Sequence, residues 1–280
     1  MILSKAFELY EKDKKLLNYS PYTLKSYKIQ SQLLIRHLGD IDLKDIDLNM
    51  LKNYQLYSMD GRKPATVAFR IKFIRSLFRW ANEEWHIIKN PSIRLMEPKM
   101  GQRIPKFLTE EQIEELNSGC VKPLEHALTS TFYATGCRIG ELQRIDKKDI
   151  NWEKYSIIVL GKGDKQREVY FDARCAIWLK KYLKSRNDDC EALFVTERRP
   201  YRRFSISQIR YIVKRIAKRS EIDINVFPHK YRHSLATRLL DKSNDIEFVR
   251  TILGHANVNT TLLYCSVSGE RRREMYNKYF

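Results

Sequence analysis

Six side chains of this chain have the types that phosphoryl transfer without a metal ion requires. Cations must contact the non-bridging phosphate oxygens, because negative charge accumulates there in the transition state. The reaction also needs a nucleophile and a proton donor for the leaving oxygen. The candidates are Arg138, Lys162, His229, Arg232, His255 and Tyr264.

The two Arg are the candidate clamps for the phosphate oxygens. Arg stays protonated, and its planar fork can bind two oxygens at once. Arg138 is expected at a helix start, where backbone N–H groups add affinity for anions. Glu141, one turn later, is expected to orient Arg138, and Arg232 shares a helix face with His229. A single Arg is ordinarily a surface cation, so the assignment depends on this setting.

Histidine and lysine supply the proton transfers. His229 can exchange a proton near neutral pH, and His255 is expected at a helix end beside a cleft. Lys162 lies between two glycines at an expected hairpin tip, where it would protonate the leaving oxygen. Lys165 is an alternative for that role, and His233, on another helix face, is expected to support the site indirectly.

Tyr264 is the candidate nucleophile. A phenol has a pKa of about 10, so it leaves more readily than an alkanol and its phosphate ester can be attacked again. The chain has sixteen Tyr, and Tyr264 is selected because it lies nine residues after His255. The sequence has no P-loop and no acidic cluster of the two-metal type. We therefore expect neither a cofactor nor a metal ion.

Five short motifs, in order TGCRIGEL, GKGDK, HKYRH, LGH and TTLLY, resemble those of the tyrosine recombinase family, which includes phage integrases and Xer-like enzymes. The resemblance covers about residues 3–270 and implies that the six groups are the catalytic set. It implies a site-specific DNA recombinase that forms a 3′-phosphotyrosyl intermediate and a Holliday junction. Tyr231, where Leu is commoner, and Cys265 depart from the family pattern without removing a catalytic group.

Composition favours a polyanionic partner and a reducing compartment. The formal net charge is +18, which suits nucleic acid, although Lys-rich genomes also produce basic proteins. The five Cys lack zinc spacing and are expected to be reduced thiols of a cytoplasmic protein. Neither a signal peptide nor an apolar run of membrane-spanning length is present, so no membrane partner is expected.

Residues 1–96 are expected to form a helical bundle with helices near 3–18, 21–38, 49–59 and 65–84. The pattern SPYTLKSY at 20–27 resembles the SAM-like core-binding domain of tyrosine recombinases. Basic residues of this bundle and of the following linker are expected to contact DNA phosphates, and they are Arg62, Lys63, Arg70, Lys72, Arg75, Arg79 and Arg103. The alternative is the solvated surface of an ordinary helical domain.

Residues 97–106 have the Pro, Gly and cations of a linker, and 107–280 are expected to form the catalytic domain. Thr109 is expected to cap a helix, and strands near 155–160 and 167–171 to form a hairpin. Further helices are expected near 122–135, 172–186, 205–220, 229–242, 245–253 and 258–265. The predicted fold is mostly α-helical, with a small antiparallel β-sheet in the C-terminal domain.

The resemblance also implies a homotetramer that acts on two double-stranded DNA sites. The tail 266–280 has a basic start and an aromatic end, and we expect each protomer to donate it to a neighbour. Packing within its own protomer is the alternative. Two other functions stay open from sequence, a DNA-binding accessory protein without catalysis and a nicking-closing enzyme like type IB topoisomerases.

Overall fold

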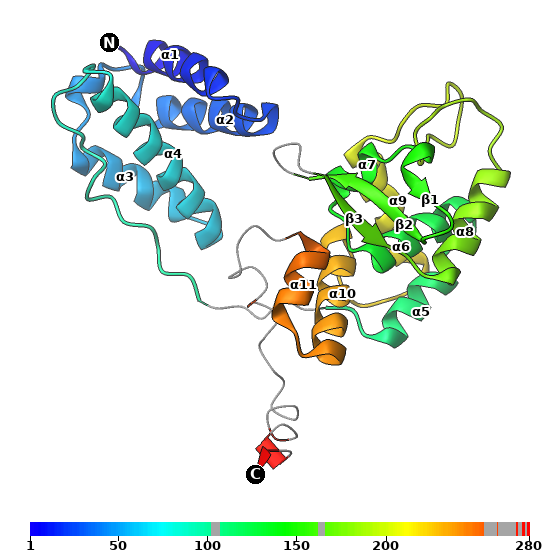
Figure 1. Ribbon diagram of the computed structural model, residues 1–280. Coiled ribbons are helices and arrows are strands. Elements are labelled where there is room, and N and C mark those ends of the chain that lie inside the picture. The colour runs from blue at the N-terminus through cyan, green and yellow to red at the C-terminus, as the bar shows by residue number, and fades with distance from the viewer. Residues whose placement is uncertain (102–106, 162–165, 255–261, 263–272, 274–275, 278) are drawn as a thin grey trace. The chain divides into compact units, whose positions relative to one another are not determined.

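The computed structural model describes residues 1–101, 107–161 and 166–254, together with 262, 273, 276, 277, 279 and 280. The chain divides into two compact units, Met1–Gln102 and Arg103–Phe280, and the division falls within residues 97–106 (Figure 1). Both are built mainly from helices, and the second contains a small antiparallel sheet, as predicted. Within the described part of the chain, no helix is long and apolar enough to span a bilayer.

The first unit contains the four predicted helices. They are α1 (Leu3–Leu16), α2 (Pro21–Leu38), α3 (Leu48–Met59) and α4 (Pro64–Glu83), with a short 3-10 turn, η1 (Leu43–Asp45). Helix α2 begins as expected, because the Ser20 hydroxyl accepts a hydrogen bond from the Thr23 amide. Helix α3 begins at Leu48, one residue earlier than predicted, and its N-cap is Asp47, whose side chain accepts a hydrogen bond from the Met50 amide.

Aromatic side chains fill the core of this unit. Tyr10 stacks on Tyr27 with ring centroids 5.8 Å apart and meets Trp80 edge-on at 5.5 Å. Its hydroxyl lies 2.7 Å from the Ser76 hydroxyl, so the polar end of a buried ring is satisfied. Helix α4 also buries Phe73, which ties α1, α2 and α4 into one core.

The second unit has a helical body and a three-stranded sheet. Its helices are α5 (Glu110–Ser118), α6 (Pro123–Thr135), α7 (Ile139–Arg144), α8 (Ala173–Lys184), α9 (Ile206–Arg219), α10 (Pro228–Ser243) and α11 (Ile246–Leu253). The 3-10 turn η2 (Lys147–Asp149) precedes β1 (Ile150–Asn151), β2 (Ser156–Leu160) and β3 (Gln166–Tyr170). The hairpin β2–β3 was predicted, whereas β1 is only two residues long and has no sequence pattern of its own.

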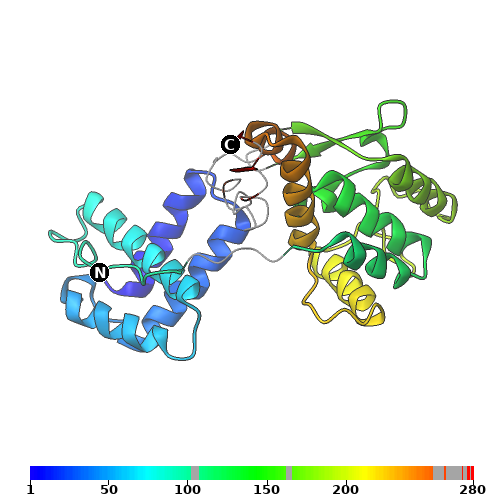
Figure 2. The same ribbon diagram turned by 90° about the horizontal axis from the view of Figure 1, so that it is seen from below.

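Helix α6 packs against α8, α9 and α10, and most of its side chains are buried. Helices α10 and α11 lie side by side and enclose a small separate core (Figures 1 and 2). Helix α6 ends at Thr135, as expected, and its C-cap is Gly136, whose φ of +57° lies in the left-handed region that glycine favours. The chain therefore turns sharply from α6 toward Arg138.

We expect Gly136→Ala to destabilise the second unit by about 1–3 kcal/mol, because a Cβ at this positive φ is strained. The added atom would also lie 2.7 Å from Leu235 Cδ2 and 3.0 Å from Leu253 Cδ2. Hydrogen exchange of α6 amides measures the change. Gly140→Ala is the control, since its Cβ meets nothing within 4 Å. Equal exchange in the two variants would contradict the expectation.

Candidate functional site

Arg138 is the N-cap of α7, as the sequence predicted. Its backbone amide donates to Glu141 Oε2 at 2.7 Å, and its Nη1 donates to Glu141 Oε1 at 2.8 Å. Its Nη2 donates to the carbonyl oxygen of Gly254 at 3.2 Å. The carboxylate is 4% exposed, whereas the Arg138 side chain is 37% exposed. Glu141 therefore holds Arg138 in a fixed direction while leaving it accessible to solvent.

Arg232 is the fifth residue of α10, which begins at Pro228. Its Nη1 donates to the carbonyl oxygen of Gly136 at 2.8 Å, and its Nη2 donates to that of Leu253 at 2.6 Å. Leu253 and Gly254 are consecutive, so the end of α11 holds both predicted clamp residues. The carbonyls at a helix C-terminus lack partners within the helix, which suits them to bind cations.

His229 and His233 lie one turn apart on α10, with ring centroids 6.3 Å apart. Desolvation and the charges of Arg232 and Arg138 lower the pKa of His229 below its ordinary value. The lowered pKa favours the neutral imidazole, which is the form that can accept a proton. The structure thus brings Arg138, Arg232 and His229 within electrostatic reach of one another.

Three other candidate groups lie outside the described residues, namely Lys162, His255 and Tyr264. The alternative Lys165 and the linker residue Arg103 also lie outside them, as does most of the expected helix 258–265. Their neighbours in the chain are described. Gly161 and Gln166 flank one gap, and Gly254 directly precedes another.

Arg167 is a site residue that the sequence analysis missed. It lies on β3 opposite Val159, and its Nη1 and Nη2 donate to Glu141 Oε1 and Oε2 at 2.6 and 2.9 Å. Burial raises the pKa of Glu141, but hydrogen bonds from Arg167 and Arg138 outweigh it and hold the pKa below its usual range. A signal was available, because Arg167 shares a strand face with the buried Val169.

The predicted DNA-contacting cations of the first unit are mostly accessible. Arg62 and Lys63 are exposed in the turn before α4, and Arg79 is exposed on α4 itself. Lys72 and Arg75 are 62% and 41% exposed and lie 3.5 and 3.9 Å from the carboxylate of Glu97. These five side chains remain candidates for contacts with phosphate.

The prediction for Arg70 was wrong. Its side chain is only 4% exposed, and its Nη1 donates to the hydroxyl of Ser58 at 2.9 Å. The reason is helical spacing, since position 70 lies three residues after Val67 and four before Ile74, on the buried face of α4. Arg70 therefore joins α4 to α3 and is not available to a phosphate.

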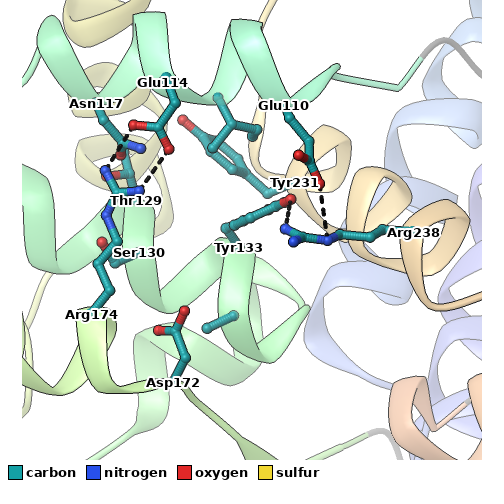
Figure 3. Close-up of a pocket in the computed structure, with 12 residues that line it drawn as sticks. Glu110, Glu114, Asn117, Thr129, Ser130, Tyr133, Asp172, Arg174, Tyr231 and Arg238 are labelled. Atoms are coloured by element: carbon teal, nitrogen blue, oxygen red, sulfur yellow. Dashed lines mark hydrogen bonds and ion pairs between the residues drawn. The ribbon is translucent and has the colours of Figure 1, made fainter. Parts of the chain in front are cut away.

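A separate pocket of about 280 Å³ lies among α5, α6, α8 and α10 (Figure 3). Its cations are already paired, Arg174 with Glu114 and Arg238 with Glu110 and the Tyr133 hydroxyl. None of the predicted site residues lines it. Over the described ranges, no group of three or more His, Cys, Asp and Glu side chains could hold a metal ion.

Comparisons with known proteins identify the family. The model of the phage integrase family matches residues 106–271. The tyrosine recombinase XerC of Corynebacterium glutamicum is 33% identical over 92% of this chain and 86% of its own. The chain belongs to the phage integrase family of tyrosine recombinases. It is a site-specific DNA recombinase, as predicted, and this function is favoured over the accessory and topoisomerase-like alternatives.

Solved structures agree with the assignment. XerA recombinase is 28% identical, with a TM-score of 0.57 over 99% of this recombinase and 97% of XerA. A lambda integrase tetramer bound to a Holliday junction is 22% identical, with a TM-score of 0.75 over 92% of this chain and 78% of its own. The second likeness establishes the fold alone.

We expect acid to destabilise the second unit through His233. Burial and the charges of His229 and Arg232 lower the pKa of His233 to about 4, from about 6.5 in an unfolded chain. The unfolded state therefore binds the proton first, and the free energy of unfolding falls as pH drops from about 6.5 toward about 4, by up to about 3 kcal/mol. As the pH is lowered through this range, the melting temperature of His233→Gln should fall less steeply than that of the wild type. Parallel plots of melting temperature against pH for the two proteins would contradict the role of His233.

Proposed function

We propose that Tyr264 attacks the scissile phosphate of a specific DNA site and forms a 3′-phosphotyrosyl bond while the bond to the 5′ oxygen breaks. His229 accepts the phenolic proton, and Lys162 donates a proton to the leaving oxygen. Arg138 and Arg232 neutralise the non-bridging oxygens, and His255 adds a hydrogen bond. Attack of a 5′ hydroxyl from the partner duplex reverses these steps and completes strand exchange.

One observation carries this proposal, the attachment of both guanidinium groups to consecutive carbonyls at the end of α11. It supports their action on one phosphate, because the two anchoring carbonyls belong to consecutive residues and hold the two guanidinium groups at the same helix end. Contacts with described residues use two of the five N–H donors of the Arg138 side chain, which leaves donors for a ligand. The lowered pKa of His229 supports its role as proton acceptor.

We further propose that residues 1–96 form the core-binding domain, 97–106 the linker and 107–280 the catalytic domain. The first domain would contact duplex DNA through accessible cations, which are Arg62, Lys63, Lys72, Arg75 and Arg79, with Arg103 from the linker. The net charge of +18 supports a DNA partner. Lambda integrase offers a precedent, as a homologous fold bound to a Holliday junction.

The assembly would be a homotetramer on two DNA sites, with the tail 266–280 exchanged between protomers. The aromatic end of the tail supports this proposal. Tyr276 and Phe280 are 62% and 95% exposed, and their rings stack at 4.8 Å. Exposed aromatic groups of this kind favour burial against another surface. Four described cysteines are free thiols, which is compatible with a cytoplasmic enzyme.

The decisive experiment traps the covalent intermediate. Sheared genomic DNA is incubated with the protein, and the DNA that stays attached to the protein in SDS is sequenced. The recovered site is then rebuilt as a nicked duplex. We expect a covalent adduct on this duplex that is lost in Tyr264→Phe. Arg138→Ala and Lys162→Ala should slow adduct formation by about 100-fold or more, because each removes stabilisation from the transition state.

Site binding is the control, and it should change by less than roughly fivefold in these variants, since DNA affinity comes from many phosphate contacts. Loss of binding in place of cleavage would mean that Arg138 or Lys162 is misassigned. An adduct without Holliday junctions between two duplexes would favour the topoisomerase-like activity. Failure of the wild type to form any adduct would overturn the proposed chemistry.

Arg79 and Arg70 provide a matched pair on α4. We expect Arg79→Ala to weaken DNA binding and to leave the free energy of unfolding unchanged. The slope of log affinity against log salt concentration should fall by about one, which corresponds to one lost phosphate contact. Arg70→Ala should lower the free energy of unfolding of the first unit by about 1–3 kcal/mol, because a buried hydrogen bond is lost. Salt titrations of binding and urea denaturation measure the two effects. Reversed effects would contradict the structural assignment.

A further inference from the structure

Arg167 and Arg138 share one buried carboxylate. Glu141 is 4% exposed, and each of its two carboxylate oxygens accepts one hydrogen bond from Arg138 and one from Arg167. The fork of Arg167 binds both oxygens, whereas Arg138 uses one side-chain nitrogen and its backbone amide. Arg167 itself is 15% exposed, so its contact with Glu141 is shielded from water. Such a shielded bidentate pair is strong and geometrically specific.

Arg167 also packs against the end of α11. A Cβ built at Gly254 would lie 2.7 Å from Arg167 Cδ and 2.9 Å from its Nε. Gly254 has a φ of +63°, and its carbonyl oxygen accepts a hydrogen bond from Arg138 Nη2. Arg167 therefore contacts both residues that hold the side chain of Arg138, namely Glu141 and Gly254.

The charges decide what this arrangement does. With both arginines present, the group formed with Glu141 carries one net positive charge. Without Arg167, the carboxylate would cancel the charge of Arg138 and compete with a phosphate for its donors. Interactions between charges strengthen as water is excluded, so the effect is large for a carboxylate this deeply buried. Arg167 thus neutralises Glu141 and leaves the charge of Arg138 available.

We propose that Arg167 is a positioning residue for the recombination reaction, which holds Glu141 and Gly254 so that Arg138 presents its guanidinium to the scissile phosphate. The inference rests on the proposed role of Arg138 as an oxygen clamp. Arg167 need not touch DNA, and its effect on cleavage passes through Glu141 and Arg138.

Arg174 supplies a matched control. It makes the same bidentate contact with Glu114, at 2.6 and 2.9 Å, on the surface of the same unit. On the nicked duplex described above, we expect Arg167→Gln to slow adduct formation by about 100-fold, as misplacement of a positioned group does. Arg174→Gln should leave the rate unchanged. Arg167→Lys keeps the charge beside Glu141 and should recover at least about tenfold of the loss.

A second substrate separates positioning from a general loss of structure. Replacing one non-bridging oxygen of the scissile phosphate with a methyl group removes the charge that Arg138 is proposed to neutralise. On this neutral methylphosphonate linkage, strand cleavage by Arg138→Ala and by Arg167→Gln should both approach that of the wild type. If Arg167→Gln does not fold, Arg167→Lys provides the same comparison.

The outcomes are distinguishable. Wild-type cleavage by Arg167→Gln on the ordinary phosphate would overturn the inference. So would a deficit that persists on the neutral linkage while that of Arg138→Ala is relieved, because Arg167 would then act through another group. A deficit of Arg138→Ala that persists on the neutral linkage would overturn the proposed role of Arg138 itself, and the inference with it.

Discussion

Glu141 is a carboxylate held almost entirely out of solvent between two guanidinium groups, and the candidate site depends on it. A buried charge is costly unless hydrogen bonds and opposite charges compensate it. Here Arg138, at the start of α7, and Arg167, on β3, supply that compensation. The contact therefore joins a helix start to a hairpin that follows it in the chain, and it sets the direction in which Arg138 points.

The end of α11 is the second anchor. Helix termini leave carbonyl oxygens without partners, and here Leu253 and Gly254 offer theirs to Arg232 and Arg138. Arg232 also binds the carbonyl of Gly136, at the left-handed turn that ends α6. Two helix ends thus fix the side chains of residues 94 positions apart in sequence. Backbone carbonyls at these two helix ends therefore complement the side-chain contact with Glu141 in fixing the site.

Local signals predicted most of the fold. Thr109 caps a helix as expected, α2 and α6 begin or end at the expected residues, and the strands of the hairpin begin and end within one residue of the predicted positions. Such features depend on a few neighbouring residues, which the sequence displays directly. The motif resemblance predicted Arg138 and Arg232, and the fold brings them to one helix end, which no local pattern specifies.

Arg70 and Arg167 show that charge alone does not imply exposure. Arg70 and Arg167 both lie in phase with buried apolar residues, Val67 and Val169 respectively, and both side chains point inward. The group that binds each arginine lies on another element. Arg70 binds the Ser58 hydroxyl, and Arg167 binds the Glu141 carboxylate. Periodicity could have placed these arginines inside the protein, but it could not have named their partners.

The pairing of Arg167 with Glu141 also favours the correct register of the β2–β3 hairpin. Successive strand residues face opposite sides, so a slip of one residue would turn Arg167 outward and bring its neighbour Glu168 inward. Two carboxylates would then meet in a poorly solvated place, and their repulsion would disfavour the misaligned form. The observed register of β3 is therefore favoured over this one-residue slip, because it places the Arg167 cation beside Glu141.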